Sequence, residues 1–144
     1  MGKQIIDFAM VSVADDKEMQ FKEYRGKIAV MITIYTSCFY GCIGVVKSCD
    51  ELAATYADKG VKFLLCNIEG KKAKSSCETF ASKNDIKTMD HFIGEAPELL
   101  KLAYIPHKVF VSKDGEIILN YKGNFEAEIE KVAEGGDTKE EEKE

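Results

Sequence analysis

The sequence predicts an α/β fold. Two apolar runs without polar alternation, at 28–35 and 61–68, read as central strands that are covered on both faces. Residues 42–58, between these runs, place their apolar side chains at helical spacing. In a strand–helix–strand order the crossover is right-handed, so we expect the two strands to be parallel neighbours in one sheet.

The other elements follow from turn signals and periodicity. Residues 5–21 alternate loosely around a turn at 15–17, which predicts a short hairpin or an irregular N-terminal arm. After the second central strand we expect, in order, an insert helix around 71–84, a short extended piece at 86–93, a helix at 97–104, a hairpin bending at 113–115 and a closing helix N-capped near Asn124. The predicted architecture is a central mixed β-sheet with helices on both faces.

The bulk composition describes a folded chain with an acidic end. Of 144 residues, 45% are hydrophobic and 31% are charged, and the net charge is −5. Much of the acidic excess lies in residues 135–144, so we expect one domain at 1–134 and a disordered acidic tail at 135–144. The near-neutral remainder argues against a nucleic-acid partner. With no long apolar segment, the expected location is cytoplasmic, without a membrane partner.

Two cysteines, Cys38 and Cys42, stand where the first central strand is expected to become a helix. Unpaired backbone N–H groups and the helix dipole at such a turn stabilise a thiolate. Residues four apart on a helix have Cα atoms roughly 6 Å apart, which is inside the range that a disulfide spans. The pair is therefore a candidate redox couple or metal site, and the simplest alternative is that both side chains fill the core.

Three local matches extend over nearly the whole chain. Gly26 and Lys27 precede the strand that leads to Cys38, and the segment "YIPHKVFVSKDGEII" contains Pro106 ahead of a strand, a turn and an edge strand. Residues 7–27 form a matching N-terminal arm. In this order the three segments, together with the insert helix, resemble the redoxin branch of the thioredoxin-fold superfamily. This branch includes TlpA-like reductases, tryparedoxins and nucleoredoxins.

The resemblance implies a thiol-disulfide oxidoreductase that needs no cofactor and no metal. Cys38 would attack protein disulfides and Cys42 would resolve the mixed disulfide. Pro106 matches the cis-proline of the family, and its loop would hold the substrate chain. The residues expected to bind or flank the substrate are Phe39, Tyr40, Ile105, Pro106 and His107. The expected partners are protein disulfides and a reductase whose identity the sequence does not give, and the chain is expected to be a monomer.

The motif also departs from the family. Ser37 stands where the family has tryptophan, three residues separate the cysteines in place of two, and Ile32 occupies the position of a buried acid. These departures motivate one alternative, a redox-degenerate adaptor that binds partners without turnover. A second alternative is a Sco-like Cu(I) chaperone, because the thiolates of Cys38 and Cys42 with the imidazole of His107 suit Cu(I).

The remaining cysteines have a simpler interpretation. Cys49, Cys66 and Cys77 are expected to be core side chains, because free cysteine is among the most buried residue types. His91 has no cysteine near it in the sequence, and it is assigned no role.

Overall fold

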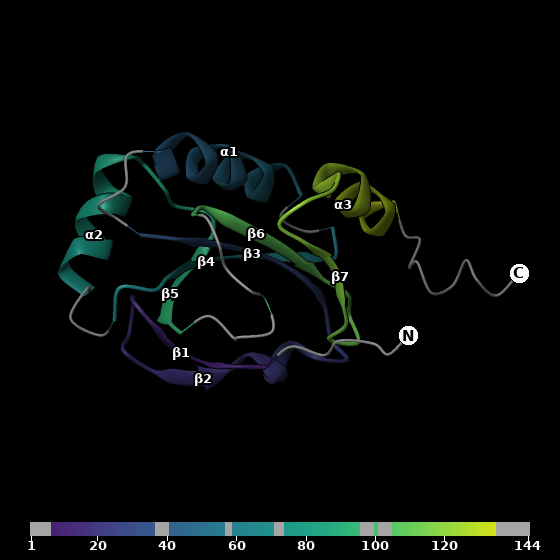
Figure 1. Cartoon of the computed structure of the whole chain (residues 1–144), viewed down its shortest axis with the longest axis horizontal. Coiled ribbons are helices and arrows are strands. Elements are labelled where there is room, and N and C mark those ends of the chain that lie inside the picture. Colours follow the sequence, from purple (N-terminus) through teal and green to yellow (C-terminus); the bar gives the residue numbers. More distant parts are fainter. Residues whose placement is uncertain are drawn as a thin grey trace, which may run out of the picture.

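A computed structural model describes residues 7–36, 41–56, 59–70, 74–95, 100 and 105–134, without the side chains of 41 and 42. Figure 1 shows the arrangement of the elements in space. In chain order they are β1 (Ala9–Ser12), β2 (Glu18–Gln20), the 3₁₀ helix η1 (Phe21–Tyr24), β3 (Ala29–Tyr35), α1 (Gly41–Thr55), β4 (Val61–Asn67), α2 (Lys74–Lys83), β5 (Asp90–Gly94), β6 (His107–Val111), β7 (Ile117–Asn120) and α3 (Phe125–Ala133).

The strands form one mixed sheet in the order β2-β1-β5-β4-β3-β6-β7. β3 is parallel to β4 along its whole length, and β4 is parallel to β5. β3 is antiparallel to β6, and the outer pairs β1–β2, β1–β5 and β6–β7 are also antiparallel. The prediction of two parallel central strands is therefore confirmed. All seven residues of β3 are buried, as expected for a strand with both faces covered.

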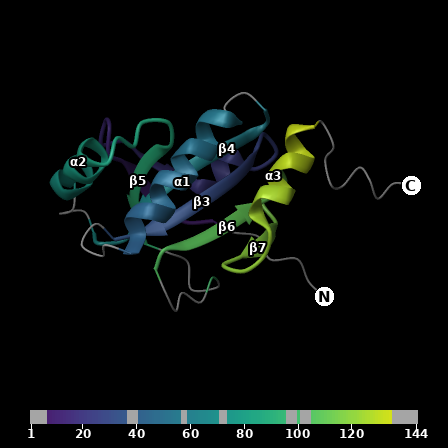
Figure 2. The ribbon, with the colours of Figure 1, turned by 90° about the horizontal axis from the view of Figure 1, so that it is seen from above.

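Alternate residues of β3 face two separate hydrophobic cores. Met31 and Tyr35 point into the first core, where α1, α2 and α3 contribute their apolar faces. Ile32 and Ile34 point into the second core, on the opposite face of the sheet. Figures 1 and 2 show α1 and α3 lying along the same face of the sheet, and β1 and β2 form one edge of this sheet.

The second core is closed by the N-terminal arm and by Leu100. Phe21 of η1 and Leu100 are 2% and 1% exposed, and both pack in this core. The helix expected at 97–104 lies outside the described residues apart from Leu100. The N-terminal hairpin is confirmed, with Met10 paired to Met19. The predicted N-cap of the closing helix is also confirmed, because the Asn124 side chain accepts a hydrogen bond from the Ala127 N–H at 3.0 Å.

The segment before β5 differs from the prediction of an extended piece at 86–93. Only 90–94 forms a strand, and residues 87–89 turn around the carboxylate of Asp50 in α1. The Thr88 and Met89 N–H groups donate to Asp50 Oδ1 at 2.9 Å, and the Lys87 N–H donates to Oδ2 at 3.2 Å. Asp50 is 7% exposed, so one nearly buried side chain fixes this turn against α1.

Replacing Asp50 should cost considerable stability. In Asp50→Ala, three backbone N–H groups lose their charged acceptor, and we expect the free energy of unfolding to fall by about 3 kcal/mol. Urea denaturation of the full chain measures this change. The neighbouring Glu51 is exposed, and Glu51→Ala should change stability by no more than about 0.5 kcal/mol. Equal effects of the two substitutions would contradict the assigned role of Asp50.

Candidate functional site

The candidate site lies at the carboxyl end of β3. β3 ends at Tyr35 and α1 begins at Gly41, so the described backbone brackets the cysteine motif with a strand and a helix. Cys42 is the second residue of α1, so the helix begins within one residue of the predicted range 42–58. Cys38, Phe39 and Tyr40 lie outside the described residues, and the predictions for them stay predictions.

The segment expected to face the motif lies at the same end of the sheet. The Ile105–Pro106 peptide bond is cis, as the resemblance predicts for this position. β6 begins directly afterwards, and its first residue, His107, is paired with Ile34 of β3. Because β3 and β6 are antiparallel, this register places Ile105 and Pro106 beside the end of β3 that leads toward Cys38. Ile105 packs against both hydrophobic cores.

His107 has an internal contact that the sequence did not predict. Its side chain is 2% exposed, and Nε2 lies 2.6 Å from Asn120 Oδ1. The Asn120 amide also donates from Nδ2 to the Leu100 carbonyl at 3.1 Å, so Oδ1 is the acceptor and His107 Nε2 is the donor. The other ring nitrogen, Nδ1, is buried without a hydrogen-bond partner among the described residues. The ring thus ties the start of β6 to the end of β7, and its expected place at the rim of a substrate groove stays a prediction.

The described structure contains only part of the ligand set that the copper alternative requires. His107 is the one expected ligand with a described side chain, since the Cys38 and Cys42 side chains lie outside. Among the described residues, no group of three or more His, Cys, Asp or Glu side chains is arranged to hold a metal ion. Copper binding therefore stays an untested alternative.

The buried Tyr35, at the end of β3, is paired with the partly buried His91 of β5. The Tyr35 hydroxyl is 2.5 Å from His91 Nε2, although the two residues are 56 positions apart. Tyr35 is fully buried, and burial raises the pKa of its phenol above the usual value of 10. Burial also lowers the pKa of His91 to about 4, so the imidazole is neutral near pH 7. No role for His91 could be predicted from the sequence, because only the pairing of β3, β4 and β5 brings it to Tyr35.

The other described cysteines are core side chains, as predicted. Cys49, Cys66 and Cys77 are free and at most 2% exposed. Burial raises the pKa of all three thiols, that of Cys66 to about 12. Since the thiolate is the reactive form, these three thiols are poor nucleophiles at neutral pH.

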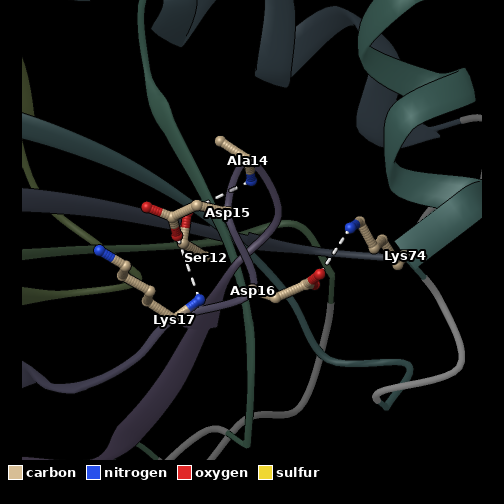
Figure 3. A network of polar contacts seen from close by, with 6 residues as sticks. All are labelled: Ser12, Ala14, Asp15, Asp16, Lys17 and Lys74. Carbon is tan, nitrogen blue, oxygen red and sulfur yellow. Dashed lines mark hydrogen bonds and ion pairs between the residues drawn. The ribbon is translucent and has the colours of Figure 1, made fainter.

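The N-terminal hairpin is attached to α2 by a polar turn, which Figure 3 shows from close by. Within the turn, the Lys17 N–H donates to Asp15 Oδ1 at 3.1 Å, and the Ala14 N–H donates to Ser12 Oγ at 3.2 Å. Asp16 then reaches Lys74 at the start of α2, with Nζ to Oδ2 at 2.9 Å. This bond, more than any other cause, raises the pKa of Lys74.

Two grooves flank α2. One, of about 740 Å³, lies between the N-terminal turn, α2 and β5, and His91 is part of its lining. The other, of about 450 Å³, lies between α2 and the first turn of α1, beside Ile43. None of the helices in the described part of the chain has the length and apolar character needed to cross a membrane.

Comparison with known proteins identifies the fold. No protein-family model matches the chain, and no curated protein matches its sequence. Solved structures do match. One is a Bacteroides vulgatus protein provisionally assigned as a thiol-disulfide oxidoreductase, with 18% identity, a TM-score of 0.75 and coverage of 89% of this chain and 93% of that chain. The chain therefore has the thioredoxin-like fold, and the predicted fold class is confirmed.

Two further structures agree with this result. A thiol:disulfide interchange protein of the thioredoxin family from Chlorobium tepidum is 14% identical, with a TM-score of 0.67 and coverage of 94% of this chain and 97% of that chain. An exposed lipoprotein thioredoxin from Streptococcus pneumoniae is 21% identical, with a TM-score of 0.66 and coverage of 90% and 99%. At these identities the likeness establishes the fold, and the chemistry must be argued from this chain's own residues.

The Tyr35–His91 pair predicts a pH-dependent stability. The folded pKa of His91, about 4, lies below the ordinary value of 6.5, so between these values the unfolded chain binds a proton that the folded chain does not. The stabilising effect is complete above pH 6.5 and is lost as the pH falls toward 4. Between pH 7 and 5 we expect a loss of about 2 kcal/mol in the free energy of unfolding.

Denaturation of His91→Gln at the same pH values is the test. Glutamine does not titrate, so this contribution should disappear and the variant should lose about 2 kcal/mol less than the natural chain between pH 7 and 5. Identical losses in the two proteins would show that His91 is not the group responsible.

Proposed function

We propose that the chain is a thiol-disulfide oxidoreductase that acts on protein disulfides through a Cys38–Cys42 couple. The observation that carries the proposal is the register of β6 on β3. It supports a site in which the Ile105–Pro106 turn and the cysteine motif lie at one end of the sheet. The similar structures, which include a provisionally assigned thiol-disulfide oxidoreductase and a thiol:disulfide interchange protein, have a thioredoxin-like fold that agrees with this assignment.

The start of α1 supplies the electrostatics that the reaction needs. α1 has 15 residues, and the free N–H groups and positive dipole end at its N-terminus favour an anion nearby. A thiolate ahead of the helix is stabilised more than a thiol, which lowers its pKa toward neutrality. Cys38 is accordingly the nucleophile, and Cys42, inside the first turn, is the resolving thiol.

The exchange proceeds in two displacements. The Cys38 thiolate attacks one sulfur of the client disulfide, the client S–S bond breaks, and the second client sulfur leaves as a thiolate. Cys42 then loses its proton and attacks the Cys38 sulfur, which releases the first client sulfur as a thiolate. The client has gained two electrons and takes up two protons, while the enzyme is left with a Cys38–Cys42 disulfide. The dithiol of a separate reductase returns this disulfide to the reduced state.

The proposed setting is the cytoplasm, with the chain acting as a monomer. The three described cysteines outside the motif are buried free thiols, which suits a compartment that keeps thiols reduced. Phe39 and Tyr40 of the motif would contact the client, together with the Ile105–Pro106 turn and with His107 behind it.

Substitution of each thiol tests the proposal. Cys38→Ser should abolish insulin reduction because it removes the nucleophile, and Cys42→Ser should stop turnover and leave a mixed disulfide that mass spectrometry detects. Cys49→Ala, in the core, is the matched control and should keep the activity per folded molecule. If the natural chain and both motif variants behave alike, and no Cys38–Cys42 disulfide forms at any potential, the adaptor alternative replaces the enzyme.

A further inference from the structure

The groove between α1 and α2 has the features of a peptide-docking site. We define the α1–α2 groove by the residues that line it: Ile43, Ser75, Ser76, Thr79, Phe80, Lys83 and Asn84. We propose that it holds an extended segment of the client protein and prefers a segment with an acidic side chain. This inference rests on the proposed function, because it places the client's chain beside the thiol exchange.

The position of the groove connects it to the cysteine motif. Ile43 follows Cys42 directly, so one wall of the groove belongs to the same turn of α1 as the resolving cysteine. The opposite wall is α2, which Figures 1 and 2 show next to the beginning of α1. An extended chain advances about 3.3 Å per residue. A client whose cysteine lies at the motif can therefore place its next few residues between the two helices.

The lining chemistry suits a polypeptide backbone. Ser75, Ser76 and Thr79 are exposed on one side of α2, and hydroxyl groups both donate and accept hydrogen bonds. An extended segment presents alternating N–H and C=O groups, so a row of hydroxyls can satisfy it whatever its sequence. Ile43 and the buried Phe80 supply an apolar surface for one side chain.

Lys83 gives the groove its charge preference. It is exposed in the last turn of α2 and forms no ion pair with another described residue, whereas Lys74 is paired with Asp16 and Lys87 with Asp85. Among the described residues that line the α1–α2 groove, none carries a carboxylate. The groove on the other side of α2 contains Glu78 and further acids. An acidic client side chain is therefore attracted to one side of α2 only.

A binding measurement tests the docking site without relying on catalysis. Two fluorescent peptides, with serine in place of cysteine, differ only in having Glu or Lys three residues from that serine. Fluorescence anisotropy with the full chain should show about three- to tenfold tighter binding of the Glu peptide, and added salt should reduce the difference. Lys83→Glu should reverse the preference, and Lys83→Gln should remove it. Lys87→Glu is the matched control and should leave it unchanged.

Kinetics with the corresponding disulfide peptides separates this inference from the proposed function. Lys83→Glu should change kcat/KM for the two peptides in opposite directions, and the reduction of hydroxyethyl disulfide should stay unchanged. If the natural chain reduces none of the disulfides but still binds the Glu peptide more tightly, the oxidoreductase proposal is overturned and the docking site is supported. Equal affinities of the natural chain and Lys83→Glu for both peptides would overturn the docking site, whatever the activity.

Discussion

The structure depends above all on β3 being buried from end to end between β4 and β6. Its backbone groups are paired with both neighbours, and its side chains alternate between the two cores. A shift of one residue would exchange the two faces, so the hydrophobic pattern permits a single register. That register also fixes which residues meet at the carboxyl end of the sheet. At that end, β6 pairs with β3 directly after the Ile105–Pro106 turn, and His91 of β5 is bonded to Tyr35.

A polar group buried near the centre of the sheet costs folding free energy unless it forms a hydrogen bond. Three groups meet this requirement through another segment of the chain: Tyr35 is bonded to the His91 side chain, His107 to the Asn120 side chain, and Asp50 to backbone N–H groups of the turn at 87–89. The bonded residues are 56 positions apart for Tyr35 and His91, 37 to 39 for Asp50 and its turn, and 13 for His107 and Asn120. The stability of the fold comes mainly from the buried apolar side chains. The polar contacts select one arrangement of loops around the sheet.

The features that could be predicted from the sequence are those that depend on local residue patterns and on the order of elements along the chain. The central strands, the helix starting near Cys42, the N-terminal hairpin and the Asn124 cap all follow from spacing and turn chemistry. The contacts of His91, His107 and Asp50 could not be predicted, because each partner is set by strand pairing or by a loop folding back. For the site, the candidate thiols and the position of Pro106 could be predicted from the sequence. The place of His107 at the rim of a substrate groove stays a prediction, and the hydrogen bond of its ring to Asn120 could not be predicted.

The helix α2, which forms one wall of the α1–α2 groove, is held in place mainly by the packing of its apolar side chains. The ion pair between Lys74 and Asp16 is partly exposed, and such pairs contribute roughly 0–1 kcal/mol. Phe80 is 6% exposed, and its ring centroid lies 4.7 Å from that of Tyr35, so its burial contributes about 2–3 kcal/mol. Tyr35 therefore contacts α2 through Phe80 and β5 through His91, and it is also the residue at which β3 ends. Tyr35 thus links the packing of α2, which forms one wall of the groove, to the end of β3 that leads toward the cysteine motif, and a change that moves Tyr35 should shift α2.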